Sequence, residues 1–181
     1  MDLGISGRNA LITGGSKGIG RACAEALAIE GVNIAIVARD PKFLESAAAE
    51  MSSNLKGHIV PITGNLTKGA EIERVFAEAE EALGQIDILV NNAGSAPLGR
   101  IRDITDATWQ ECFDLKLMGY VRCSRAVMTG MCKRKWGRII NIIGRGGHFP
   151  TAKYIAGGAI NAAILNITQA LAEECGPYNV L

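Results

Sequence analysis

Residues 10–20 read Ala-Leu-Ile-Thr-Gly-Gly-Ser-Lys-Gly-Ile-Gly, and this stretch decides how the chain folds. Its first four residues are typical of a buried strand, and glycines then follow at the spacing Gly14-x3-Gly18-x-Gly20. Glycine lets the backbone turn sharply and leaves the first N–H groups of the next helix open to an anion. The stretch predicts a strand, a turn and a helix, with the turn either binding a phosphate or serving only as a tight connection.

Outward from this stretch, short apolar runs alternate with longer segments of helical period. We expect strands over residues 10–13, 33–38, 59–62, 86–90 and 138–143, the third interrupted by Pro61. We expect helices after each strand, including long ones over residues 105–135 and 151–174. Strands that alternate with helices imply βαβ units. The pattern predicts one α/β domain over residues 1–181, a doubly wound parallel sheet in a three-layer α/β/α arrangement.

Composition excludes several classes of protein. The formal net charge is +1, and no basic stripe is present, which argues against nucleic-acid binding. The five cysteines are odd in number and form no CxxC motif, as in a reducing compartment. The N-terminus lacks the apolar region of a signal peptide, and no uninterrupted apolar run approaches the ~18 residues of a membrane span. We predict a cytoplasmic protein with no membrane span and no metal site.

Two motifs carry a resemblance to a known family. Thr13-Gly14-x3-Gly18-Ile19-Gly20 resembles the cofactor motif of the short-chain dehydrogenase/reductase family, and Asn91-Asn92-Ala93-Gly94 resembles its second signature. The resemblance runs from residue 5 to the last residue and implies a Rossmann-type fold. It implies cofactor contacts at the following positions: Gly14, Ser16, Lys17, Gly18, Ile19, Gly20, Arg39, Asn65, Leu66, Asn92, Ala93, Gly94 and Tyr154.

The end of the second strand points to the cofactor. Members that prefer NAD(H) usually carry an acid at the position of Ala38, where it binds the ribose diol; in this chain the acid is absent and Arg39 follows. A guanidinium holds a phosphate bidentately, and Lys17 adds a second positive charge. We therefore expect NADP(H) rather than NAD(H), against the alternative that both cations are ordinary surface residues.

The catalytic set departs from the family. The family uses Asn, Ser, Tyr and Lys, and only Tyr154 is kept, because the lysine position falls on Gly158, the serine position on Gly144 and the asparagine position on Lys116. We predict that Lys116 replaces the missing lysine electrostatically beside Tyr154. For the missing serine, the candidates are backbone N–H groups of residues 144–147 or the side chains of Arg145 and His148. The alternative is that Tyr154 is a leftover cleft residue and Lys116 a surface lysine.

These features favour an NADP(H)-dependent oxidoreductase that acts on a small carbonyl or alcohol substrate. The alternative is an NADP(H)-binding protein without turnover, such as a redox sensor; a methyltransferase is disfavoured by the Asn-Asn-Ala-Gly motif. Family resemblance implies a homodimer or homotetramer, paired through the two long helices. Members of the family continue past the position of Leu181 with further strands and a substrate-covering segment, so we expect truncation after the fifth strand. Substrate identity and reaction direction stay open.

Overall fold

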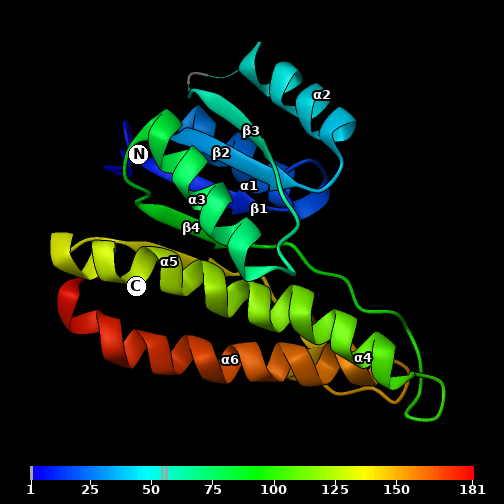
Figure 1. The fold of residues 1–181 in the computed structure, drawn as a ribbon. Helices are drawn as coiled ribbons and strands as arrows, with labels where there is room; N and C mark the ends of the chain where they lie inside the picture. Colours follow the sequence, from blue (N-terminus) through cyan, green and yellow to red (C-terminus); the bar gives the residue numbers. More distant parts are fainter. Residues whose placement is uncertain (1, 54, 56) are drawn as a thin grey trace.

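The computed structural model describes residues 2–53, 55 and 57–181. Its centre is a parallel sheet in the order β3-β2-β1-β4-β5 (Figure 1). The strands are β1 (Asn9–Thr13), β2 (Asn33–Ala38), β3 (Ile59–Thr63), β4 (Ile88–Asn91) and β5 (Arg138–Asn141). The helices are α1 (Gly18–Ile29), α2 (Pro41–Ser52), α3 (Gly69–Leu83), α4 (Asp106–Cys112), α5 (Gly119–Arg134) and α6 (Ile155–Cys175). The predicted doubly wound α/β fold is confirmed.

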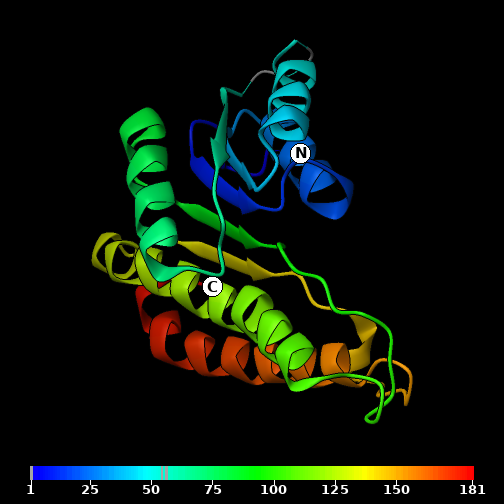
Figure 2. The same ribbon diagram turned by 45° about the vertical axis from the view of Figure 1, so that its right-hand side comes forward.

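The alternation of side chains along each strand builds two cores, one on each face of the sheet. From β1, Leu11 faces the layer of α3 and α5, whereas Ile12 faces the layer of α1 and α2. Both residues are fully buried, as expected for central strands covered by helices on both faces. Helix α6 lies alongside α5 (Figures 1 and 2), and its Ile160 and Ile164 form a third cluster with Tyr120.

Strand β3 tolerates Pro61 because it lies at the edge of the sheet. Proline lacks the N–H that a strand donates to its neighbour, so it is confined to edges and bulges. Pro61 stands opposite Ile36 of β2 and is exposed. The apolar run at residues 59–62 therefore forms a regular strand despite the proline.

Several boundaries differ from the sequence-based expectation. The long helix predicted over residues 105–135 is divided by a π-helical segment, η1 (Phe113–Met118), which separates α4 from α5. The helix predicted over residues 151–174 begins only at Ile155, because residue 153 pairs outside it: the Gly99 N–H donates to the Lys153 carbonyl oxygen at 2.8 Å. Strand β5 ends at Asn141, two residues earlier than expected. Tyr154 therefore lies at the N-cap of α6, not inside the helix.

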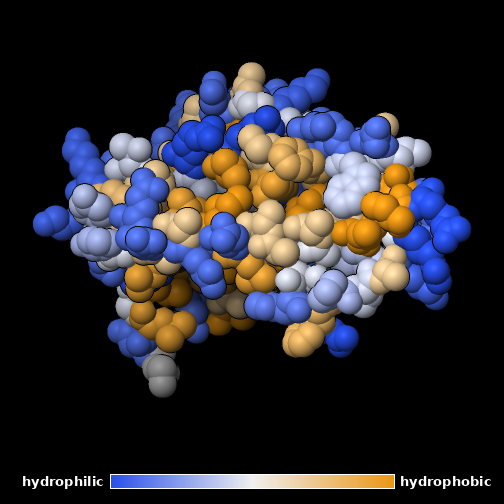
Figure 3. Space-filling view, turned by 90° about the horizontal axis from the view of Figure 1, so that it is seen from below, coloured by the Kyte–Doolittle hydropathy of each residue, from blue (hydrophilic) through white to orange (hydrophobic). Residues whose placement is uncertain are grey.

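Helix α6 and the turn that follows it form a long apolar stretch. Within the part of the chain that the structure describes, the stretch Ile155–Tyr178 is long and apolar enough to cross a membrane by composition, with 33% of its most apolar window buried. One such helix is weak evidence, because core helices pass the same criterion. Figure 3 shows apolar residues gathered across the middle of the face that lies at the bottom of Figure 1, where α6 runs.

Candidate cofactor and active site

The turn after β1 is held by the neighbouring strand. The Gly14 N–H donates to the Val37 carbonyl oxygen at 2.7 Å, and Gly14 has a φ of +68°, a conformation that favours glycine. A Cβ on Gly20 would collide with the Gly14 carbonyl group, so this close approach also requires glycine. Lys17, at the N-cap of α1, makes no side-chain capping hydrogen bond. The first N–H groups of α1 are therefore available to an anion.

Asn92 joins the end of β4 to this turn. Its Nδ2 donates to the carbonyl oxygens of Thr13 at 3.0 Å and Gly14 at 3.2 Å. Its backbone N–H and that of Ala93 donate to the Thr13 hydroxyl at 2.8 and 3.0 Å. The second motif thus fixes the shape of the first, which agrees with a supporting role for Asn92.

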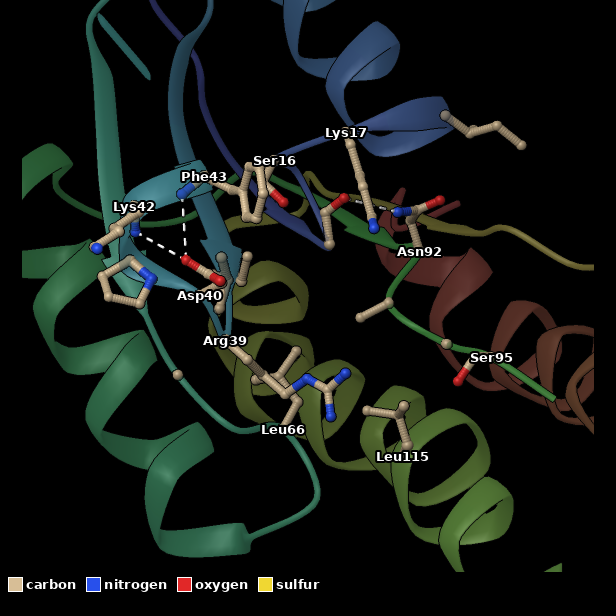
Figure 4. A pocket seen from close by; sticks show the side chains of 18 residues that line it. Ser16, Lys17, Arg39, Asp40, Lys42, Phe43, Leu66, Asn92, Ser95 and Leu115 are labelled. Atoms are coloured by element: carbon tan, nitrogen blue, oxygen red, sulfur yellow. Dashed lines mark hydrogen bonds between the residues drawn. The ribbon is translucent and has the colours of Figure 1, made fainter. Parts of the chain in front are cut away.

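A cleft of about 1060 Å³ opens at the carboxyl ends of the strands (Figure 4). It is lined by nine of the predicted cofactor residues: Gly14, Ser16, Lys17, Ile19, Arg39, Leu66, Asn92, Ala93 and Gly94. The volume reaches the upper end of the ~300–1,000 Å³ typical of ligand sites. The cleft combines an open helix start with cations and apolar walls, a donor set that fits a phosphorylated dinucleotide.

At the end of β2, Arg39 lies at the mouth of the cleft, and the acid next to it in the sequence is engaged elsewhere. The neighbouring carboxylate of Asp40 is occupied, because its Oδ1 accepts from the N–H groups of Lys42 at 3.0 Å and Phe43 at 3.3 Å as the N-cap of α2. Among the described residues, Arg39 forms no ion pair. In Figure 4 its side chain extends across the cleft toward Leu66 and Leu115.

Some predicted residues lie outside the lining. Asn65 is engaged in its own turn, where its Oδ1 accepts from the Thr67 N–H at 3.2 Å and hydroxyl at 3.0 Å. Gly18, Gly20 and Tyr154 also lie outside the lining. Sequence reasoning missed Phe43 and Leu115, which line the cleft. Neither residue carried a signal in the sequence, because the 71% exposure of Phe43 beside the cleft is known only from the structure.

Lys116 lies beside the second motif. It belongs to η1, and its aliphatic stem packs so closely on Gly94 that a Cβ there would be 2.8 Å from the Lys116 Cδ. The Nζ is 5.9 Å from the centroid of the Tyr120 ring. Burial lowers the pKa of the Lys116 ammonium. Lys116 is therefore half-buried against Gly94, which lines the cleft, and is not a solvated surface lysine.

Tyr154 lies on the other side of this region, in a slot made by glycines. A Cβ on Gly157 would collide with the Tyr154 ring, and one on Gly146 would be 3.0 Å from its Cδ1. The parallel bridge between Gly99 and Tyr154 holds the segments after β4 and β5 together, and Figure 2 shows both leaving the sheet toward the same side. The structure thus places Tyr154 against Gly146 and Gly157, and Lys116 against Gly94.

The candidates for the missing serine lie in the turn after β5. Residues Arg145–Gly147 form a single 3-10 turn, closed by the Gly147 N–H on the Gly144 carbonyl oxygen at 3.1 Å. The Arg145 guanidinium stands 5.6 Å from the centroid of the Phe149 ring, and both Arg145 and His148 are exposed. Neither side chain lines the cleft.

Comparison with known proteins identifies a family and relatives that this chain resembles. A family model described as short chain dehydrogenase matches residues 8–181. The chain is 32% identical over 177 residues to 2,3-dihydro-2,3-dihydroxybenzoate dehydrogenase of Bacillus subtilis, with 98% of this chain and 67% of that protein covered. It is 32% identical to 3-ketodihydrosphingosine reductase of Bos taurus, with 98% of this chain and 55% of that protein covered.

Solved structures give the same result. The structure of L-sorbose reductase from Gluconobacter frateurii, complexed with NADPH and L-sorbose, superposes with a TM-score of 0.95 at 33% identity. The match covers 99% of this chain and 68% of that one. The chain thus spans between 55% and 68% of the length of these three proteins.

Proposed function

This chain belongs to the short-chain dehydrogenase family, and from that membership we propose that it binds NADP(H) and transfers a hydride between the nicotinamide and a small carbonyl or alcohol substrate. The cofactor supplies the hydride when bound, and the protein supplies binding, orientation and a proton. The open start of α1, Lys17 and Arg39 would hold the phosphates, and Leu66 would contact the adenine.

One observation carries the preference for NADP(H): Arg39 lines the cleft with no ion-pair partner among the described residues, while the nearby Asp40 is committed to capping α2. An acid directed at the ribose would repel a 2′-phosphate, whereas a guanidinium binds it through charge-assisted hydrogen bonds. The L-sorbose reductase that this chain resembles was solved with NADPH.

The test is titration of NADPH and NADH against the wild type and Arg39→Ala. Loss of a charge-assisted phosphate contact, worth about 1.5–3 kcal/mol, should weaken NADPH binding roughly 10- to 100-fold and leave NADH binding unchanged. Lys133→Ala on the exposed end of α5 is the control and should change neither affinity. Equal binding of NADH and NADPH by the wild type would refute the assignment.

For the chemistry, we propose that the Tyr154 phenol gives the proton to the developing alkoxide and that Lys116 assists it. An unperturbed phenol has a pKa of ~10, far from neutrality, and a cation within ~4–6 Å favours the phenolate. The half-buried position of Lys116 supports this role, because desolvation strengthens its interaction with a neighbouring charge.

Measurements of turnover test the proposed roles of Tyr154 and Lys116. NADPH oxidation by the wild-type protein is screened against a panel of ketones and aldehydes, and Tyr154→Phe and Lys116→Ala are then assayed with any substrate found. Each variant should lose turnover and keep most of its NADPH affinity. An unchanged rate in one variant removes that residue from the mechanism, and NADPH binding without any turnover in the wild type favours the cofactor-binding protein instead.

We also propose that α5 and α6 pair with their copies in a homodimer or homotetramer in the cytoplasm. The apolar face of α6 supports this, since Ala159 and Ala162 are exposed on it and small residues allow close helix approach. Sedimentation at micromolar concentration is the test, and a monomer would contradict the assembly.

A further inference from the structure

The interior of the active-site region holds a polar side chain without a partner. Asn161 of α6 has no exposed surface, and neither its Oδ1 nor its Nδ2 has a hydrogen-bond partner in the part of the chain that the structure describes. Buried amides are almost always paired, because an unmade hydrogen bond costs the full desolvation of the group. An unpaired donor and acceptor therefore call for a specific explanation.

The surroundings of Asn161 are glycines. A Cβ on Gly144 would be 2.9 Å from the Asn161 Nδ2, and one on Gly147 would be 3.0 Å from the Asn161 Cβ. The amide thus fills the space that a side chain at position 144 would need. Gly144 closely follows the end of β5, one strand over from the motif that ends β4. It is also the position where the family resemblance expects a serine.

We propose that the Asn161 amide supplies, from α6, the hydrogen-bond donor for the substrate oxygen that position 144 lacks. The inference rests on the proposed function, because it assigns a residue to the same reaction. The unpaired Nδ2 group carries two N–H donors. Because packing holds them in place before the reaction, they need no rearrangement as charge develops on the substrate oxygen. Asn161 would act beside Tyr154. The Tyr154 ring lies against Gly157, which precedes Asn161 by one turn of α6.

The turn that covers Asn161 is suited to admit a ligand oxygen. It contains Gly144, Gly146 and Gly147, and it is closed by backbone hydrogen bonds from the N–H groups of residues 147, 148 and 149. Since glycine offers little resistance to a change of backbone dihedrals, a small shift of this turn exposes the amide. His148 and Phe149 at its end are already exposed.

The first experiment separates this role from a structural one. Asn161→Leu replaces the amide by an apolar group of similar size. If Asn161 only holds structure through a buried water, the variant should be less stable; if the amide is kept for the substrate, the variant should melt at or above the wild-type temperature. The kcat should fall about 100-fold or more, as when one oxyanion donor is removed, with NADPH affinity unchanged. Gln85→Leu, at an exposed position after α3 and away from the helices proposed to pair, is the control for both measurements.

The second experiment moves the hydrogen-bond donor from position 161 to position 144. Asn161→Ala should lose kcat to a similar extent, and Gly144→Ser combined with Asn161→Ala should restore it to within about tenfold of the wild type, because a serine hydroxyl then occupies the same space. Gly144→Ala with Asn161→Ala has the same Cβ without the hydroxyl and should remain inactive. If wild-type turnover exists and Asn161→Leu keeps it, or if the alanine pair recovers as well as the serine pair, this inference is wrong and the proposed function stands. A wild type without turnover overturns both.

Discussion

The cofactor cleft and the turn after β5 use their polar groups in opposite ways. At the cofactor cleft, the amide of Asn92, the hydroxyl of Thr13 and the carboxylate of Asp40 are all engaged within the protein. Beside the turn after β5, the amide of Asn161 is unpaired among the described residues and Gly144 has no side chain. Paired groups build a shape, whereas unpaired ones remain available to a ligand. This difference leaves backbone N–H groups and cations as the groups that the cofactor cleft offers to a ligand.

The largest expected effect follows from distorting the turn after β1. Gly20→Val places a branched side chain against the Gly14 carbonyl group, where even a Cβ has no room. Because backbone cannot yield as a flexible side chain does, the turn should lose its shape and NADPH binding should disappear. Overpacking of this kind destabilises by about 1–3 kcal/mol or more. Titration and urea unfolding measure the two effects.

Gly69→Val is the matched control, since Gly69 lies in the first turn of α3, as Gly20 does in α1, and nothing lies within 4 Å of its Cβ position. It should bind NADPH like the wild type. Normal NADPH affinity in Gly20→Val would mean that the turn tolerates distortion and that its shape is not what selects the ligand.

A smaller effect is expected from Asn92→Ala. The change removes two hydrogen bonds and leaves the carbonyl groups of Thr13 and Gly14 without this donor. At about 0.5–1.5 kcal/mol for each bond, the free energy of unfolding should fall by about 1–3 kcal/mol. NADPH affinity should fall by less than in Gly20→Val, because the glycines still allow the turn to form.

The control for this variant is Gln85→Ala, at an exposed position after α3. If Asn92→Ala is as stable as the wild type but binds NADPH poorly, the amide contacts the cofactor and is not only a brace. That outcome would move Asn92 from the engaged group of side chains to the available group.

The same contrast explains what the sequence could and could not predict. The β1 turn and the Asn92 motif were predictable, because their glycine spacing and strand-end positions mark them in the sequence, although the hydrogen bonds between them join residues 78 to 80 positions apart. The start of α6 was not, since no pattern in the sequence marks the long-range pairing of Gly99 with Lys153. Asn161 gave no signal either, because an asparagine in an apolar helix becomes significant only once its burial without a partner is known. Lys116 was identified through its family position, but the π-helix that carries it was not foreseen.

The smallest effect concerns Lys116, and it is a dependence on pH. Burial lowers the pKa of this ammonium below its ordinary value of ~10.4, so the folded chain releases the proton before the unfolded chain does. Below the folded pKa both states are protonated, and the full cost of burying the charge is present. As the pH rises from the folded value toward ~10.4, the unfolded state binds more protons, and the wild type gains stability. The free energy of unfolding of the wild type, relative to Lys116→Met, should therefore increase between neutral and alkaline pH.

Urea unfolding at several pH values checks this prediction, and taking the difference from Lys116→Met cancels the titration of all other groups. Lys133→Met is the control, because Lys133 is exposed on α5. The control difference should not change with pH over the same range. If the wild type instead loses stability relative to Lys116→Met as the pH rises, the folded state favours the ammonium, which requires an anionic partner beside it. Lys116 would then belong with the engaged groups of the cofactor cleft, and its proposed assistance to Tyr154 would have to compete with that partner.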